Sequence, residues 1–198
     1  MDFVTEQLDE DCCLHVTQLP VDLSPDRATL DRLWELHPAT YHRIWMHGRQ
    51  VDTPRFQQAY GADYHYTGTT NQALPIPREL AALHAWCNAT IDARLNGLLL
   101  NWYDAALGHY IGRHRDSTKN MCEGTPIVTL SLGEERIFRL RPWRGTGRRD
   151  FPAPHGTVFV MSQATNRAFT HEVPHLRRDR GRRISLTWRA FKASATAS

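Results

Sequence analysis

A histidine and an aspartate two positions apart, His114 and Asp116, lie in the segment GRHRDSTKN. Two histidines and one carboxylate on one side of a ferrous ion form the site of many non-haem iron oxygenases, and they leave positions open for a cosubstrate and oxygen. Because side chains two apart on a strand point the same way, both residues could bind one ion. A polar surface loop is the alternative interpretation, since the chain contains 11 histidines. An iron site therefore requires a third ligand from elsewhere.

His171, in the segment AFTHEVP, is the best candidate for the third ligand because it lies within a predicted strand. Three other histidines are weaker candidates. His175 follows Pro174 and is expected on a loop, whereas His155 opens the segment HGTVFVM and could be structural. His109 has no carboxylate two residues later.

The segment RRISLTWRAF carries two arginines, Arg183 and Arg189, six residues apart. On a strand this spacing places both on one sheet face, and Ser185 and Thr187 continue that face. A buried arginine requires an anionic partner, and a dicarboxylate cosubstrate would supply one because arginine binds carboxylates bidentately. The alternative is that both arginines pair with acidic residues at the surface.

Two segments that could support these residues are expected to be helices. SPDRATLDRLWELH, residues 24–37, has a helix-start pattern with Ser24 as N-cap and Pro25 as the first helical residue. PRELAALHAWCNATIDARL, residues 77–95, repeats apolar residues at intervals of three or four, as an amphipathic helix does.

Short β-branched or aromatic segments follow Gly97, separated by glycine and proline: LLLNWY, TPIVTLSLG, RIFRLRPW, GTVFVM, AFTHEVP and RRISLTWRAF. They predict a mostly β fold with flanking helices. Its core would be a sandwich or a jelly roll (double-stranded β-helix), covered by the two N-terminal helices. We expect one domain over residues 1–198. Its parts are an N-terminal extension and helix at 1–37, an irregular or hairpin segment at 38–77, a helix and jelly-roll core at 78–192, and a tail at 193–198.

The composition is that of a globular protein, with 41% hydrophobic and 23% charged residues and no apolar run long enough to span a bilayer. The first residues lack the features of a signal peptide. The four cysteines show no zinc-site or C-x-x-C spacing, which favours an intracellular, reducing compartment, cytoplasmic or nuclear. Residues 1–40 hold nine acidic residues and two arginines, a net charge of −7. Because the whole chain has a net charge of +3, residues 41–198 carry +10. A basic body is typical of proteins with a polyanionic partner such as nucleic acid, although solvated surface arginines would give the same balance.

Taken in order, these motifs resemble the AlkB family of Fe(II)- and 2-oxoglutarate-dependent dioxygenases. The residues that carry the resemblance are Asn101-x-Tyr103, His114-x-Asp116, His171 and Arg183-x5-Arg189. TPIVTLSLG, PHGTVFVM and FTHEVP resemble the core strands of the family. TPRFQQAYGADYHYTG resembles the nucleotide-recognition region of the subgroup that repairs alkylated DNA, so residues 38–77 would be a substrate-recognition lid.

The resemblance implies a role for each matched residue. His114, Asp116 and His171 would be the catalytic Fe(II) ligands; Asn101, Tyr103, Arg183, Ser185 and Arg189 would bind 2-oxoglutarate. With O2, the cosubstrate would give succinate and CO2, and an N-methyl group would leave as formaldehyde. The implied substrates are bases such as 1-methyladenine or 3-methylcytosine in single- or double-stranded DNA or RNA, and the base would be flipped into the pocket. We expect a monomeric enzyme with no membrane partner. Aromatic residues that could stack on the base are Trp102, Tyr60, Tyr64 and Tyr66.

Three positions depart from the family pattern. Thr118 replaces an acidic residue that reads the base, Ser185 replaces a frequent asparagine, and His47 occupies the place of an aromatic finger in a duplex-probing relative. Two alternatives therefore remain. One is the same iron chemistry on a protein side chain, a modified tRNA base or a small molecule, and the other is a non-catalytic jelly-roll module that binds nucleic acid.

Two arginine-rich segments, RPWRGTGRRD and HLRRDRGRR, bear on the partner. Their arginines are Arg141, Arg144, Arg148, Arg149, Arg177, Arg178, Arg180 and Arg182. If both segments line the rim of the pocket they would bind phosphates, and otherwise they are unrelated solvated loops.

Overall fold

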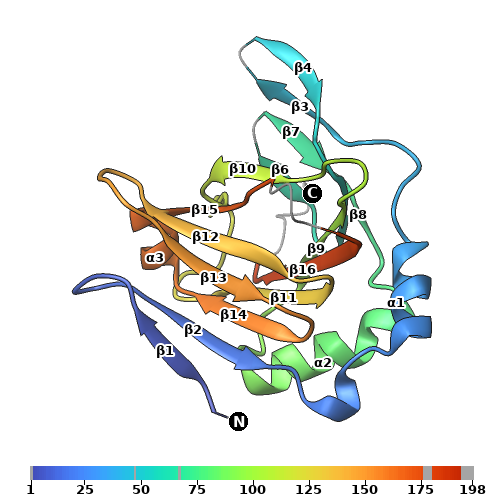
Figure 1. Cartoon of the computed structure of the whole chain (residues 1–198), viewed down its shortest axis with the longest axis horizontal. Helices are drawn as coiled ribbons and strands as arrows, with labels where there is room; N and C mark the ends of the chain where they lie inside the picture. Colours follow the sequence, from blue (N-terminus) through green and yellow to red (C-terminus); the bar gives the residue numbers. More distant parts are fainter. Residues whose placement is uncertain (1, 47, 67, 176–179, 193–198) are drawn as a thin grey trace, which may run out of the picture.

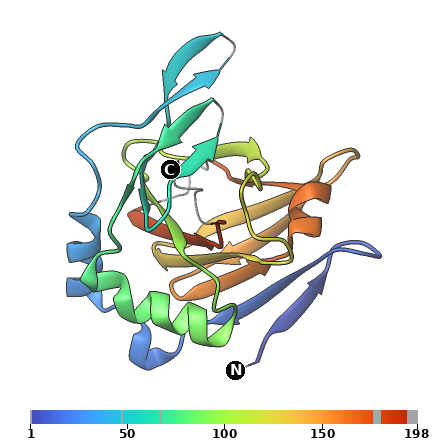
Figure 2. The ribbon, with the colours of Figure 1, turned by 180° about the vertical axis from the view of Figure 1, so that it is seen from behind.

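The computed structural model describes residues 2–46, 48–66, 68–175 and 180–192. The predictions for His47, for Arg177 and Arg178 and for the tail at 193–198 lie outside these residues. The described chain is mostly β, as the sequence indicates, with helices at its side (Figures 1 and 2).

The larger sheet has eight strands in the order β1-β2-β14-β11-β16-β9-β5-β8. Their bounds are β1 Val4–Gln7, β2 Cys13–Gln18, β5 Phe56–Tyr60, β8 Ala73–Leu74, β9 Gly97–Asp104, β11 Ile127–Gly133, β14 Thr157–Met161 and β16 Arg182–Arg189. All neighbours are antiparallel except β5 and β8. The long central strands β9 and β16 pair over their full length, from Arg182 opposite Asp104 to Arg189 opposite Gly97.

The smaller sheet has four strands in the order β10-β15-β12-β13. Their bounds are β10 Ile111–His114, β12 Arg136–Pro142, β13 Arg149–Ala153 and β15 Phe169–Val173. Phe138 of this sheet stacks on Phe159 of the larger one, with 4.8 Å between ring centroids. Leu140 and Phe151 join the same buried cluster as Met161. The two sheets are therefore held together by an apolar core.

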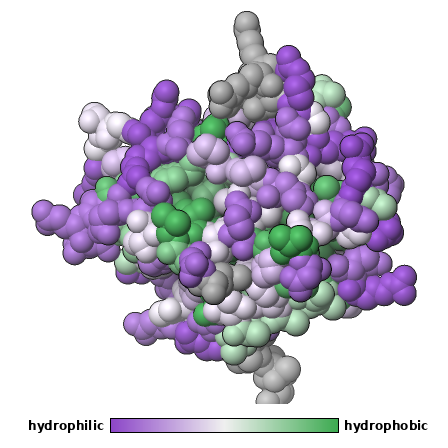
Figure 3. Space-filling model, turned by 60° about the horizontal axis from the view of Figure 1, so that its bottom comes forward, coloured by the Kyte–Doolittle hydropathy of each residue, from purple (hydrophilic) through white to green (hydrophobic). Residues whose placement is uncertain are grey.

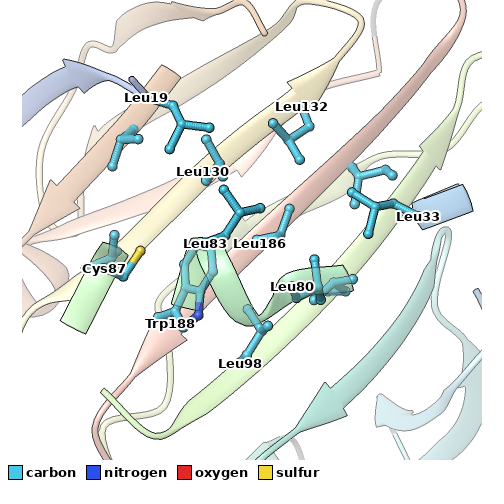
Figure 4. Close-up of a cluster of buried hydrophobic side chains, with 14 of the residues drawn as sticks. Leu19, Leu33, Leu80, Leu83, Cys87, Leu98, Leu130, Leu132, Leu186 and Trp188 are labelled. Carbon is cyan, nitrogen blue, oxygen red and sulfur yellow. The ribbon is translucent and has the colours of Figure 1, made fainter. Parts of the chain in front are cut away.

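Helices cover the opposite face of the larger sheet. The helix α1 spans Arg27–Trp34 and α2 spans Ala81–Thr90, preceded by the short 3-10 helices η1 Val21–Leu23 and η2 Arg78–Leu80. Figure 4 shows Leu83 and Cys87 of α2 against Leu98, Leu186 and Trp188 of the sheet. This second core fixes β9 and β16 from behind.

Some local expectations were wrong. The N-cap of α1 is Asp26, whose side chain accepts a hydrogen bond from the Thr29 backbone N–H at 2.8 Å, and not Ser24. The Ser24 hydroxyl instead forms a hydrogen bond with the His155 ring at 2.8 Å and does not cap the helix. The two helices are not both N-terminal, because α2 follows the 38–77 segment. A third helix, α3 Gln163–Ala168, precedes β15.

The segment 38–77 is built largely from two hairpins, β3 Arg43–Met46 with β4 Arg49–Asp52 and β6 Tyr64–Tyr66 with β7 Thr69–Asn71. Both project beyond the end of the larger sheet (Figure 1). They lie on the same side of the molecule as β10, which ends at the His114 motif.

A space-filling view from the other end of the molecule shows a mostly polar surface with small separate apolar patches (Figure 3). Within the described residues, no helix has the length and hydropathy needed to cross a bilayer.

Candidate metal centre and its pocket

His114, Asp116 and His171 come together in the structure. Their ligand atoms all lie within 4.8 Å of one another. Asp116 Oδ1 is 3.6 Å from Nε2 of each histidine, and the two rings are 4.2 Å apart between centroids. β10 and β15 produce this meeting because their pairing places His114 directly opposite His171.

Hydrogen bonds orient the ligand atoms. His114 Nδ1 lies 2.9 Å from the Gly112 carbonyl oxygen, which accepts a hydrogen bond from Nδ1–H and leaves Nε2 as the lone-pair nitrogen. Asp116 directs Oδ2 to Arg189 Nη2 at 2.5 Å, so Oδ1 faces the histidines. Two imidazole nitrogens and one carboxylate oxygen on one side are a donor set suited to Fe(II).

Local electrostatics favour metal-binding protonation states. Burial alone would raise the pKa of Asp116, but the Arg189 guanidinium and then His171 outweigh burial and hold that pKa well below its ordinary value. Burial, followed by the nearby His171, lowers the pKa of His114. A carboxylate and a neutral imidazole are the forms that ligate metals.

Arg183 and Arg189 both point into the same space as the three ligands. Both are almost fully buried, and no carboxylate among the described residues pairs with Arg183. Arg183 Nε donates to Ser131 Oγ at 2.8 Å, while its buried Nη1 has no acceptor within the described part of the chain. The surface ion-pair alternative is therefore excluded for Arg183, and an anion would satisfy the remaining donor.

A cavity of about 470 Å³ joins these groups. Asn101 and Tyr103 of β9 line it, together with Ser185 of β16, opposite Asn101 in the sheet register. The Arg183 guanidinium lies 5.2 Å from the Tyr103 ring centroid. All eight residues that sequence reasoning selected for metal and cosubstrate thus border one cavity.

A family model described as the 2OG-Fe(II) oxygenase superfamily matches residues 27–189, which include every residue named for this cavity. The chain belongs to the 2OG-Fe(II) oxygenase superfamily.

Curated relatives refine this membership of the superfamily to the AlkB family. A human protein named DNA oxidative demethylase ALKBH2 is 28% identical over 171 residues, which are 81% of this chain and 65% of the relative. A rat protein named Alpha-ketoglutarate-dependent dioxygenase alkB homolog 3 is 30% identical over 154 residues, 69% of this chain and 50% of the relative. The chain thus spans less than two thirds of the length of either protein.

A solved structure titled "The structure of OsALKBH1" matches with a TM-score of 0.58 at 14% identity, covering 94% of this chain and 99% of that chain. At this identity the match supports the fold of this oxygenase and nothing finer.

The structure of this oxygenase also reveals residues that the sequence did not single out. Arg55 is buried in the cavity wall and donates from Nε to Asn101 Oδ1 at 2.7 Å. Arg113 and Arg115 border the cavity from β10 and the residues after it, and both are exposed. Neither Arg113 nor Arg55 has a local signal, because strand alternation would direct Arg113 away from the face of His114, and the partner of Arg55 is 46 residues away.

Asn166 of α3 is another residue beside the candidate site that the sequence did not single out. Its side chain accepts from the Asp116 backbone N–H at 2.9 Å and donates to the Asp116 carbonyl at 3.0 Å. Asn166 is 1% exposed, so both bonds are shielded from water. It holds the backbone of Asp116 just beyond the end of β10.

Two of the four aromatic candidates for base stacking were wrong. Trp102 and Tyr60 belong to the core beneath the helices, and the Trp102 indole N–H donates to the Leu33 carbonyl at 2.9 Å. Tyr64 and Tyr66 do line the cavity, with 5.1 Å between their ring centroids.

Two of the weaker candidates for the third ligand, His109 and His155, make structural hydrogen bonds. His109 accepts from the Asp104 backbone N–H at 3.1 Å and bonds to the Tyr41 hydroxyl at 2.9 Å. His155 accepts from the Gly133 N–H at 3.0 Å, at the edge of a wider surface depression beside α1. His175 is exposed.

The arginine-rich segments present less uncompensated charge than their sequences indicate. Arg141 pairs with Glu172 at 2.9 Å, Arg149 with Glu6 at 2.7 Å and Arg182 with Asp104 at 3.3 Å. The exposed Arg113 and Arg115 are closer to the cavity than these pairs are, since both line it.

Proposed function

We propose that this chain is a 2-oxoglutarate-dependent non-haem iron dioxygenase that oxidatively demethylates alkylated bases of DNA or RNA. The products would be succinate, CO2, formaldehyde and the unmodified base. The observation that carries the proposal is the cavity in which His114, Asp116 and His171 meet the buried Arg183 and Arg189.

In this proposal the three ligands hold Fe(II), which when bound supplies the oxidising power that protein side chains lack. Arg183 binds the distal carboxylate of 2-oxoglutarate through Nη1, which has no acceptor among the described residues. Arg189 orients Asp116 and lies at the metal end of the cosubstrate. Asn101, Tyr103 and Ser185 complete its contacts from β9 and β16.

The finer features of the fold and of the partner belong to the same proposal. The two sheets would form a double-stranded β-helix within a single domain, and the hairpins of residues 38–77 would form the lid over a flipped base. Tyr66 would stack on that base. The exposed Arg113 and Arg115 at the cavity rim would contact phosphates, and the protein would act as a monomer.

The test uses Fe(II)-loaded protein, 2-oxoglutarate and single-stranded oligonucleotides with one N-methylated base, against the unmodified oligonucleotide. We expect succinate and formaldehyde in equal amounts, dependent on the methylated base and abolished by a chelator. Succinate that ignores every oligonucleotide would redirect the same chemistry to a protein or small-molecule substrate. Absence of succinate together with salt-sensitive oligonucleotide binding would indicate a non-catalytic binding module.

A further inference from the structure

Three side chains on the outer strands of the larger sheet form a cluster that the candidate metal centre does not use. Cys13 and His15 are two residues apart on β2, so both point to the same face of the sheet. Thr5 of β1 lies opposite His15 in the antiparallel pair. Strand alternation and strand register therefore bring a thiol, an imidazole and a hydroxyl side by side.

The distances join the three groups in series. Cys13 Sγ lies 3.5 Å from Nε2 of His15, and Nδ1 of the same ring lies 2.9 Å from Thr5 Oγ1. When Nδ1–H donates to the Thr5 hydroxyl, Nε2 carries the lone pair and can accept the thiol proton. A nucleophile within hydrogen-bond reach of a base, with the base oriented by a third group, is the arrangement that activates a cysteine.

The other three cysteines lack this arrangement within the described chain. Cys87 is fully buried, and burial raises the pKa of its thiol to about 12. Cys12 belongs to the core between the two sheets, where burial and then Asp9 raise its pKa. Cys122 is partly exposed, as Cys13 is, but no described imidazole forms a hydrogen bond with its sulfur. Cys13 alone among the described thiols thus combines access to solvent with a neighbouring base.

We infer that Cys13 is a reactive thiol and a site of modification by peroxides, with His15 as its base and Thr5 as the group that orients the base. The thiol proton passes to His15 Nε2, and the sulfur attacks the terminal oxygen of the peroxide. A sulfur–oxygen bond forms as the oxygen–oxygen bond breaks, so the sulfur loses two electrons and becomes a sulfenic acid. The leaving oxygen takes the proton from His15 and departs as water or an alcohol.

This cluster is separate from the candidate metal centre. β1 is the edge strand of the larger sheet, and β1 and β2 lie on the side of the molecule away from β10 (Figure 1). His15 is paired with Val160 of β14, whose side chain belongs to the core beneath the helices, so the three groups lie on the sheet face that turns away from the cavity. The inference therefore does not rest on the proposed function and involves no iron.

The test measures the reaction of each cysteine of the folded 198-residue chain separately. A chelator is present so that no iron reacts with the peroxide. The protein is treated at neutral pH with iodoacetamide, or with hydrogen peroxide and dimedone as a trap for sulfenic acid, and mass spectrometry gives the rate at each thiol. We expect Cys13 to react at least about tenfold faster than Cys122 in both assays, and Cys12 and Cys87 to react more slowly still. Equal rates at Cys13 and Cys122 would overturn the inference.

Variants assign the reactivity to the cluster. His15→Gln keeps a polar group but removes the base, and should lower the rate at Cys13 by about tenfold. Thr5→Val removes the orienting hydroxyl at nearly constant shape and should lower the rate by a smaller factor. His65→Gln is the matched control, because His65 Nδ1 lies 2.8 Å from Thr70 Oγ1 across the β6–β7 pair, which contains no cysteine. That variant should label as the wild-type protein does. An unchanged rate at Cys13 in folded His15→Gln protein would contradict the role given to the imidazole.

Discussion

The two faces of the larger sheet have opposite compositions although the same strands build them. Toward the helices, β9 and β16 present Leu98, Leu100, Trp102, Ile184, Leu186 and Trp188. Toward the cavity, the alternate residues are Asn101, Tyr103, Arg183, Ser185, Thr187 and Arg189. One face supplies stability and the other supplies chemistry, so a substitution on either face should affect mainly one of them.

The difference explains how buried arginines are tolerated next to the candidate metal site. An uncompensated charge in a protein interior is costly, and the apolar face behind it supplies burial energy, at about 25 cal/mol per Å² of apolar surface. Residues of α1 and α2 pack against these strands from behind, so an apolar core backs the strands that carry the arginines (Figure 4).

The largest effect is expected from the ligands on the cavity side. His171→Ala or Asp116→Asn should reduce turnover by about three orders of magnitude because an Fe(II) ligand is lost. Their unfolding free energy in urea should change far less than their activity. The matched control is His175→Ala, at an exposed histidine four residues away. An active His171→Ala protein would show that the third ligand is misassigned.

On the apolar face, Leu100→Ala should lower the free energy of unfolding by about 2–5 kcal/mol, since a fully buried leucine leaves a cavity behind. Leu74→Ala, at a leucine that is 52% exposed, is the control and should cost little. Urea denaturation measures both. If Leu100→Ala raised the KM for 2-oxoglutarate while the protein stayed folded, the separation of the two faces would be wrong.

Arg183→Ala should raise the KM for 2-oxoglutarate by about a hundredfold, because the distal carboxylate loses a buried charged donor. The affinity for the metal should stay nearly unchanged, since Arg183 contacts none of the three ligands through a hydrogen bond. Arg183→Lys should recover part of the loss. Steady-state kinetics with varied 2-oxoglutarate would contradict the anchor role if the KM did not move.

Asn166→Ala removes both hydrogen bonds to the Asp116 backbone and should weaken Fe(II) affinity by about 10- to 100-fold, the usual effect of losing a group that orients a ligand. Metal titration under anaerobic conditions measures it. Asn166→Asp, which keeps the acceptor and loses the donor, should fall between wild type and alanine. Equal affinity in all three proteins would remove this positioning role.

The smallest effect is expected for Trp102→Phe, which keeps the ring buried and loses the bond to the Leu33 carbonyl. We expect a loss of about 1 kcal/mol in unfolding free energy and no change in oligonucleotide affinity. A clear loss of binding to methylated oligonucleotides would restore Trp102 as a base-stacking residue.

Sequence reasoning succeeded where strand alternation alone decides the outcome. Residues 183, 185 and 189 must share a face once RRISLTWRAF is a strand. The expectation of one strand through His114 and Asp116 was wrong, because β10 ends at His114 and Asn166 holds the Asp116 backbone beyond it. His171 was chosen among the histidines for its position in a predicted strand, and the structure places it opposite His114 and beside Asp116.

The remaining features depend on tertiary register that no local pattern encodes. Arg55, the residue before β5, donates a hydrogen bond to Asn101 of β9, 46 residues later. Asn166 accepts a hydrogen bond from the backbone of Asp116, 50 residues earlier. Trp102 was misassigned because it lies between Asn101 and Tyr103, and the same alternation that directs those two to the cavity directs Trp102 to the core. The N-cap of α1 is Asp26, two residues later than predicted, and the Ser24 hydroxyl instead bonds to the ring of His155, 131 residues away.

The most direct test of the central claim is whether the cavity face binds Fe(II) and 2-oxoglutarate together. Anaerobic addition of 2-oxoglutarate to the protein with one equivalent of Fe(II) should produce a metal-to-ligand charge-transfer band, which should be absent from His171→Ala and require far more 2-oxoglutarate in Arg183→Ala. No band in the wild-type protein, or an unchanged band in His171→Ala, would contradict the site described for this cavity.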